Sequence, residues 1–255
     1  YTTLFRSPSN TVPSQGGAAG MSALALLWED SRAPDAVTQT RNKLAAYAGN
    51  MFPADGGYSE GPLYWDFGVS YYLWFAHADH NTTGDDTLVN NPNLLQQYRF
   101  AETMLGGNGQ FMTFNDTGGP RLTALPVCAD LGSRLDNDLM LWLADLMAKR
   151  KAGHSTPDVT VSCRGAFLPL AALLRDAAPG PSAFPGVPTV SALGTINWGV
   201  MRNRGDTYVP DLAVGVKGSK GRLSHHKQND LGSFLVYAGG EMLLIDPGYW
   251  DSAAN

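Results

Sequence analysis

The spacing of hydrophobic residues changes along the chain, from a helical period to an alternating one. Residues 35–51 repeat apolar positions at helical spacing, and residues 66–78 form a strongly apolar, aromatic run. Further helices are expected at 21–28, 92–106, 136–149 and 164–176. Strands are predicted later, where apolar residues alternate with less apolar ones at Tyr208, Leu212, Val214 and Val216. Helices followed by strands indicate an α+β protein.

Two short apolar runs near the end of the sequence predict a β-hairpin. Ser233–Tyr237 and Glu241–Ile245 are rich in strand-forming residues and flank the pair Gly239-Gly240. Adjacent glycines supply the positive φ angles that a tight hairpin turn requires. The turn would bring Asp246 back towards Gln228 and Asn229, so that one region of the sheet would hold His226, Gln228, Asp230 and Asp246.

The division into domains follows from composition. Residues 177–194 are rich in Pro, Gly and Ser, which predicts a linker between a helical part, 8–176, and a strand part, 195–255. Residues 1–7, YTTLFRS, match the in-frame translation of a common sequencing-adapter oligonucleotide, so we expect an artefact there. A hairpin this close to Asn255 leaves a sheet edge open, so the sheet is expected to be truncated.

Overall composition narrows the class of protein. The chain has 255 residues and 44% hydrophobic content, which fits a soluble protein of one large or two small domains. No apolar run approaches the ~20 residues that a membrane-spanning helix needs. The net charge of −5 argues against general nucleic-acid binding. Cys128 and Cys163 allow either one disulfide or two free thiols.

A local basic cluster stands out against this acidic background. It consists of Lys217, Lys220, Arg222 and Lys227, and it is extended by Arg202 and Arg204. The same stretch contains His225, His226, Gln228 and Asn229. Guanidinium groups pair well with carboxylate and sulfate, so the cluster predicts a site for an acidic ligand.

Residues 226–248 also carry a recognisable pattern. Its members are His226, Gln228, Asp230, Gly232, Ser233 and Phe234, followed after the hairpin by Asp246 and Gly248. This pattern resembles the His-x-His-x-Asp-x-Gly-Ser-Phe signature of heparinase II/III-like polysaccharide lyases, except that Gln228 replaces the second histidine. The resemblance implies an incomplete (α/α) toroid followed by a truncated antiparallel β-sandwich, with the substrate in a cleft between them.

A second stretch, Asp55–Tyr64 (DGGYSEGPLY), resembles the loop that carries the catalytic tyrosine of that family. The resemblance implies that Tyr64 is this phenol, with Tyr58 and Tyr71 as second and third candidates. It implies that His226 is catalytic, or that His225 is if the alignment shifts by one. Asn10, in NTVPSQGG, resembles an asparagine that binds the substrate carboxylate, although it could instead cap a loop. Substrate binding is assigned to Glu60, Lys217, Arg222, His225, Gln228 and Asn229.

The resemblance also bears on metal binding and localisation. Asp246 matches a zinc-ligand aspartate of several family branches, but its usual histidine partner is replaced by Gln228. An amide oxygen is a poorer zinc ligand than imidazole, so tight zinc binding is not expected in this chain and no cofactor is required, although the resemblance allows zinc in a complete protein. The family relationship implies a periplasmic or secreted protein.

These observations lead to three functional hypotheses. The first is a lyase that cleaves a uronic-acid-containing polysaccharide, of glycosaminoglycan or alginate type, by β-elimination. The alternative is a non-catalytic protein with a lyase-like fold that binds acidic glycans. A glycoside hydrolase ranks last, because it needs a carboxylate pair, and the available Glu60 and Asp66 lack a recognisable spacing. An acidic polysaccharide is the expected partner in the first two cases, and the oligomeric state stays open.

Overall fold

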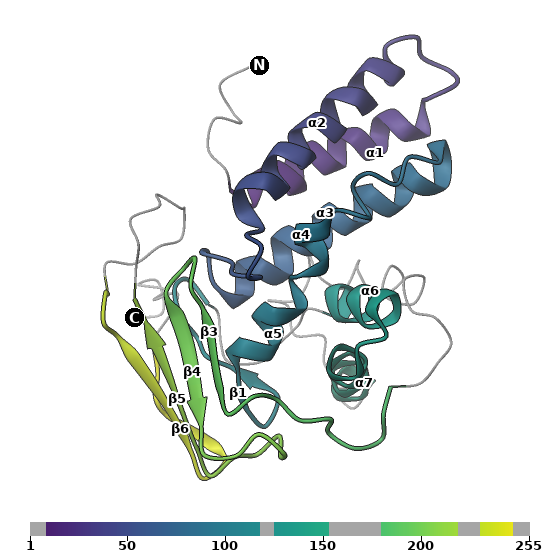
Figure 1. Ribbon diagram of the computed structural model, residues 1–255. Helices are drawn as coiled ribbons and strands as arrows, with labels where there is room; N and C mark the ends of the chain where they lie inside the picture. Colours follow the sequence, from purple (N-terminus) through teal and green to yellow (C-terminus); the bar gives the residue numbers. More distant parts are fainter. Residues whose placement is uncertain (1–8, 118–124, 153–179, 219–229, 247–255) are drawn as a thin grey trace, which may run out of the picture.

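The computed structural model of the protein describes residues 9–117, 125–152, 180–218 and 230–246. The first two ranges are mainly helical, and the last two form a five-stranded antiparallel sheet (Figure 1). Helices and strands are segregated along the chain, which confirms the α+β prediction. Among these residues, no helix is both long and apolar enough to cross a membrane.

Three helices and a π-helical turn pack together at the start of the described chain. The turn η1 and helices α1, α2 and α3 span Val12–Gly16, Gly17–Ala25, Ala33–Met51 and Pro62–Thr83. Gly20 lets α1 approach both neighbours, because a Cβ there would lie 2.5 Å from Phe75 of α3 and 2.5 Å from Thr40 of α2. The helices predicted at 35–51 and 66–78 are confirmed.

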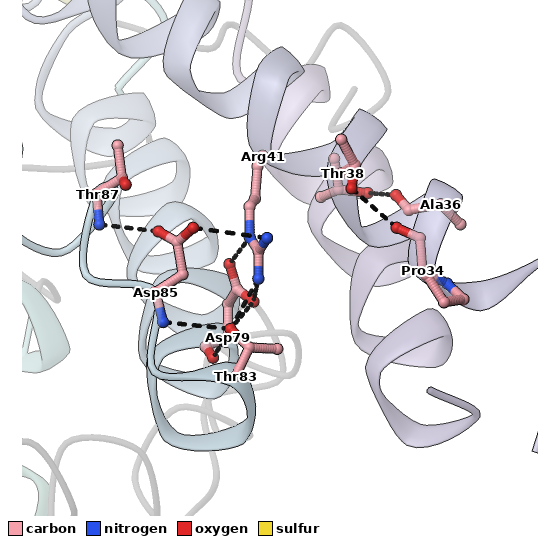
Figure 2. A network of polar contacts seen from close by, with 9 residues as sticks. Pro34, Ala36, Thr38, Arg41, Asp79, Thr83, Asp85 and Thr87 are labelled. Atoms are coloured by element: carbon pink, nitrogen blue, oxygen red, sulfur yellow. Dashed lines mark hydrogen bonds and ion pairs between the residues drawn. The ribbon is translucent and has the colours of Figure 1, made fainter. Parts of the chain in front are cut away.

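An ion-pair network joins α2 to the C-terminal end of α3 (Figure 2). Arg41 Nε and Nη2 donate to the two carboxylate oxygens of Asp79, at 2.5 and 2.7 Å. Nη2 also donates to Thr83 Oγ1 at 2.7 Å, and Asp85 lies 3.5 Å from Nη1. Because Asp79 is only 1% exposed, this two-pronged contact fixes how the two helices pack.

The middle of the chain contains α4, α5, the short strands β1 and β2, and then α6 and α7. Their bounds are Pro92–Leu95, Tyr98–Met104, Leu105–Gly107, Gln110–Phe111, Leu125–Leu135 and Asp138–Ala152. The single helix expected at 92–106 is therefore split, and it ends early because Leu105 is extended and pairs with Phe111. The helix predicted at 136–149 is confirmed as α7, whereas 164–176 lies outside the described residues. Helix α6 was not predicted from the sequence.

One of the two cysteines lies in α6. Cys128 is fully buried and carries a free thiol. Its burial raises the pKa of the thiol well above the ordinary value. Its possible partner Cys163 lies outside the described residues. Cys128 therefore has a structural role in the core, since a buried thiol behaves as a small apolar side chain.

The sheet is a meander in which each strand pairs with the next. Strands β3 to β7 span Val190–Leu193, Trp198–Arg202, Leu212–Lys217, Phe234–Ala238 and Glu241–Leu244. The predicted hairpin is confirmed, with φ of 59° at Gly239 and 92° at Gly240. The first strand begins at Val190, inside the segment 177–194 that composition assigned to a linker. It is an edge strand held by pairing with β4, and composition carries no signal of that pairing.

One face of the sheet packs on the helical part. Trp198 of β4 lies 5.2 Å from Phe114 and 6.4 Å from Phe100, measured between ring centroids. Arg202, on the same strand, reaches across and donates to the carbonyl oxygens of Thr103 and Leu105 at 2.6–2.9 Å. Helix α5 lies between the sheet and the other helices (Figure 1). The two parts therefore share one core.

Arg202 corrects an expectation from the sequence. It was expected to extend an exposed basic strip, but it is only 6% exposed and its guanidinium is occupied by backbone carbonyls. Burial lowers the pKa of Arg202 to about 10, partly opposed by the charge of Glu102. Arg204 does remain at the surface, where it pairs with Asp206 at 2.9 Å.

Candidate functional site

The loop between α2 and α3 carries the first group of candidate residues. Asp55 Oδ1 accepts a hydrogen bond from Gly57 N–H at 3.0 Å, and its Oδ2 accepts one from Thr195 N–H at 2.7 Å. Thr195 belongs to the β3–β4 turn, so Asp55 attaches the loop to the sheet. Gly56 has a φ of 80°, and a Cβ there would lie 2.4 Å from the Gln96 carbonyl oxygen. The glycine-rich sequence is thus required by a close backbone contact.

Glu60 belongs to the same loop, and its side chain is fully buried. Its Oε2 accepts hydrogen bonds from Asn10 N–H and Tyr58 O–H, both at 3.3 Å. The Tyr58 hydroxyl also bonds to the Tyr47 hydroxyl at 2.7 Å. Burial raises the pKa of Glu60 to about 7, although the Asn10 and Tyr58 hydrogen bonds act in the opposite direction. No cation among the described residues contributes to this shift.

This burial corrects two expectations. Glu60 was expected to contact substrate, but its carboxyl is held by Asn10 and Tyr58 and is 0% exposed. Tyr58, the second candidate for the catalytic phenol, is also 0% exposed, and burial raises its pKa well above the ordinary value. A base that must reach a sugar ring cannot be a phenol enclosed in this way. Gly68 of α3 makes room for the cluster, since a Cβ there would lie 2.4 Å from Tyr58 Oη and 2.5 Å from Tyr47 Oη.

Asn10 is brought to the loop from fifty residues away in the sequence. The residue is 3% exposed, and its side-chain Nδ2 is buried without a hydrogen-bond partner among the described residues. A buried donor without a partner is costly in a folded protein. Such a donor is therefore a candidate for binding a ligand or an ordered water.

Tyr64 lies in the first turn of α3. The helix begins after Gly61, which has a φ of 93°, with Pro62 at its first position. The Tyr64 ring is half-buried and lies 6.4 Å from Phe67, edge to face. Tyr71, the third candidate, is half-buried on the same helix, 4.7 Å from Phe67. Of the three candidate tyrosines, Tyr64 and Tyr71 thus keep partial access to solvent and Tyr58 does not.

Lys217, at the end of β5, occupies a second buried cluster. Its Nζ donates to Asn115 Oδ1 at 2.5 Å and forms a close ion pair with Asp230, and it lies 6.0 Å from the centroid of Trp198. Ser233 Oγ donates to the other oxygen of Asp230 at 3.1 Å. Partial burial acts to raise the pKa of Asp230, but Lys217 and Ser233 outweigh it and the pKa lies below its ordinary value.

The placement of Lys217 is a further correction. The sequence predicted that it faces an acidic ligand on an exposed strip, whereas it is 2% exposed and neutralised by Asp230. The alternation of β5 explains the difference, because Lys217 follows Ala213 and Gly215 on the face that packs on the helical part. The residues that surround it come from distant parts of the chain, so their pairing leaves no local sequence signal.

Asn115 is a member of the site that the sequence reading missed. Its Nδ2 donates to the Ser59 carbonyl oxygen at 2.8 Å, while its Oδ1 accepts from Lys217. The residue is 0% exposed and has a φ of 63°, a conformation that asparagine tolerates better than most residues. An asparagine at a required left-handed position was the available signal.

Several predicted residues cannot be placed. His225, His226, Arg222, Gln228 and Asn229 lie outside the described residues, as do Lys220 and Lys227. Asp246 is described, and its backbone carbonyl oxygen accepts a hydrogen bond from Thr113 Oγ1 at 3.4 Å. Within the described ranges no group of three or more His, Cys, Asp or Glu side chains has an arrangement suited to a metal ion.

Comparison with known proteins gives matches among solved structures. No family model matches the sequence, and no curated protein matches it. The structure of a heparinase III superposes with a TM-score of 0.67 at 16% identity, covering 97% of this chain and 36% of that one. A second heparinase III gives a TM-score of 0.64 at 14% identity, covering 99% of this chain and 34% of that one. The chain has a heparinase III-like fold.

A third match agrees with this assignment of the fold. The heparan sulfate lyase from Pedobacter heparinus superposes with a TM-score of 0.60 at 13% identity, covering 94% of this chain and 33% of that one. The chain therefore spans about a third of the length of these solved heparinase III-like chains. At such identities the likeness concerns the fold, and the chemistry must be argued from the residues of this chain.

Proposed function

We propose that this chain is part of a polysaccharide lyase that cleaves a uronic-acid-containing polysaccharide, of glycosaminoglycan or alginate type, by β-elimination. The observation that carries the proposal is the attachment of the loop that precedes Tyr64 to the sheet through Asn115, in a heparinase III-like fold. Helical and strand residues assigned from the sequence thereby belong to one connected structure.

The chemistry sets what the site must supply. A base removes the C5 proton of the uronate, a C4–C5 double bond forms, the C4–O4 bond breaks, and an acid protonates the departing O4. The C5 proton is weakly acidic because the adjacent carboxylate is already negative. Donors that neutralise this carboxylate stabilise the developing enolate, which is where fixed dipoles contribute most.

The residues of this chain can be assigned to these roles. Tyr64 serves as base, as acid, or as both in turn, since a half-buried phenol at a helix start can reach a bound sugar. Asn10, whose buried Nδ2 has no described partner, is the amide donor to the uronate carboxylate. His226 is the second neutralising group, on the strength of its position in the signature.

The finer architecture is part of the proposal. The outer face of the sheet carries a row of apolar residues aligned across all five strands, at Val190, Met201, Val214, Val236 and Leu244. Val190, Met201 and Leu244 are 68%, 49% and 48% exposed. Apolar residues aligned on an open face are typical of a sheet that packs on a second layer. This supports a β-sandwich, with the helices forming part of an (α/α) toroid.

No metal takes part in the proposed reaction. Asp246 offers one carboxylate, and the residue at the second signature position is Gln228. That donor set does not fit a zinc site, which draws its ligands from imidazole, thiolate and carboxylate groups. The proposed setting is periplasmic or secreted, where a lyase meets an extracellular polysaccharide.

Spectroscopy tests the proposal. The protein is incubated with heparin, heparan sulfate or alginate, and ultraviolet absorbance of the conjugated 4,5-unsaturated uronate is followed. We expect a steady rise with at least one polymer, and a loss of at least about a hundredfold in Tyr64→Phe. Tyr98→Phe is a matched control on α5 that should retain the activity. A flat trace with every uronan would contradict the proposal.

One alternative has a specific observation in its favour. Gln228 replaces a signature histidine, which favours a protein that binds acidic glycans without cleaving them. Retention on an immobilised uronan, with no new product, would support it. A hydrolase is disfavoured, because Glu60 is fully buried and Asp66 is 4% exposed and accepts a hydrogen bond from Ser70.

A further inference from the structure

Three hydrogen-bonding contacts in series connect the loop before α3 to the sheet. Asn115 donates to the Ser59 carbonyl oxygen, Lys217 donates to Asn115, and Lys217 pairs with Asp230. We propose that Asn115 and Lys217 are positioning residues, which fix the start of α3, and hence Tyr64, relative to the sheet. The kinetic part of this proposal rests on the proposed lyase function, whereas its geometric part does not.

On the helical side, Asn115 acts on the backbone immediately before α3. Ser59 lies five residues before Tyr64 and two before Gly61, where the helix begins. A Cβ at Gly61 would lie 2.6 Å from the Phe114 carbonyl oxygen and 3.3 Å from Asn115 Cβ. The loop thus rests directly on the segment that holds Asn115. A displacement of this segment would move the first turn of α3.

On the sheet side, Lys217 is fixed by backbone as well as by charge. Lys217 N–H donates to the Ser233 carbonyl oxygen and Gly232 N–H donates to the Lys217 carbonyl oxygen, both at 2.9 Å. Gly218 N–H donates to the Asn197 carbonyl oxygen at 2.7 Å. The ammonium is therefore held where β5 ends and where the chain returns into β6. In the sequence, His226 lies between these two points.

The residue types match this role. A primary amide is needed at position 115, because it donates to Ser59 with one end and accepts from Lys217 with the other. Lys217 is 2% exposed and Asn115 is 0% exposed, so neither side chain can exchange its partner for bulk water. Removing one member deprives its neighbours of a hydrogen bond in a place with little access to water, which transmits the change along the series.

The discriminating variant is Asn115→Asp. It keeps the size of the side chain and the acceptor for Lys217, and aspartate tolerates the left-handed backbone, but it cannot donate to Ser59. Thr117→Val is the matched control, because Thr117 is also buried in this segment and its Oγ1 donates to the Phe114 carbonyl oxygen at 2.8 Å. Lys217→Met removes the contacts of Lys217 with Asn115 and Asp230, and it carries a larger risk of unfolding the protein. Asn115→Asp is therefore the variant that tests the positioning role.

Two measurements separate positioning from general stability. In the absorbance assay we expect Asn115→Asp to lower kcat about tenfold to a hundredfold with KM changed less than about threefold, while Thr117→Val keeps both. Hydrogen exchange should become faster at the amides of 55–64 in Asn115→Asp and stay unchanged in Thr117→Val. A wild-type kcat together with unchanged exchange in Asn115→Asp would overturn the proposal.

The exchange arm keeps this inference separate from the lyase proposal. If wild-type protein yields no unsaturated product, the proposed function fails, and faster exchange confined to 55–64 in Asn115→Asp still supports the positioning role. If the enzyme is active and Asn115→Asp loses activity through a raised KM alone, Asn115 contributes to binding and the positioning role is contradicted.

Discussion

Two clusters of polar residues contact the loop before α3, and they affect the pKa of a wholly or partly buried carboxyl in opposite ways. Glu60 is surrounded by Tyr58, Tyr47 and Asn10, with no described cation, and burial raises its pKa to about 7. Asp230 is paired with Lys217, and its pKa lies below the ordinary value. The comparison teaches that the sign of a pKa shift depends on whether a cation accompanies the carboxyl into the interior.

The two clusters should therefore respond to pH in opposite directions. The folded pKa of Glu60 is raised from 4.5, so its protonated form contributes stability that is complete below pH 4.5 and is lost as pH rises through about 7. The folded pKa of Asp230 is lowered from 3.8, so its contribution is present above that value and is lost as pH falls through the folded pKa. The combined contribution of these two groups to stability should therefore be greatest in mildly acidic solution.

Removal of the Lys217 ammonium should have the largest effect on the free energy of unfolding. Lys217→Met removes the cation that pairs with Asp230 and the donor to the buried Asn115 Oδ1, and we expect a loss of about 3–4 kcal/mol in the free energy of unfolding. Urea denaturation at neutral pH measures it. Lys43→Met, at an exposed position of α2, should change the value by less than about 0.5 kcal/mol. Equal effects of the two substitutions would show that the pairing of Lys217 with Asp230 contributes no more to stability than an exposed lysine does.

A substitution in α3 should disturb the other cluster. Gly68→Ala places a methyl group about where the Tyr58 and Tyr47 hydroxyls meet, and we expect a loss of about 2–3 kcal/mol on thermal or urea unfolding. Gly49→Ala in α2 is the control, because nothing lies within 4 Å of its Cβ position. That change should instead stabilise the protein by about 0.5–1 kcal/mol. If both substitutions destabilised the protein, crowding against the Tyr58 and Tyr47 hydroxyls would not explain the effect of Gly68→Ala.

Neutralising Glu60 should have a somewhat smaller effect that depends on pH. Glu60→Gln keeps an acceptor for Asn10 and Tyr58 but cannot ionise, so at pH 8 the variant should be more stable than wild type by roughly 2 kcal/mol. The difference should shrink towards zero near pH 4.5, where wild-type Glu60 is protonated. Urea titrations at the two pH values measure it. Parallel pH profiles for the two proteins would mean that Glu60 titrates normally.

Local sequence patterns predicted much of the fold. Local sequence alone specifies three elements: the helices at 35–51 and 66–78, through their helical spacing, and the hairpin turn, through the glycine pair at 239–240. All three are confirmed. Strand β3 and helix α6 were missed. Strand β3 sits at the edge of the sheet and depends on its partner β4, so its own composition resembles a linker.

The candidate site was harder to predict than the fold, because its contacts join distant residues. Lys217 and Asn115 are 102 positions apart, and Arg202 and Leu105 are 97 apart. Lys217 and Arg202 were interpreted as members of an exposed basic strip, since lysine and arginine are mostly exposed in folded proteins. Their burial follows from carboxylate, amide and carbonyl partners that only the tertiary structure brings together. Tyr64 and Asn10 were found through a resemblance, and their catalytic roles stay predictions.

The most direct test of the proposed chemistry is the mass of the products released from heparan sulfate or alginate by the wild-type protein. Elimination breaks the C4–O4 bond without adding water, so the account predicts oligosaccharides with an unsaturated non-reducing end. Products heavier by one water would instead show hydrolysis, and a polymer recovered uncut would show that the protein does not cleave it. Either result would contradict a lyase.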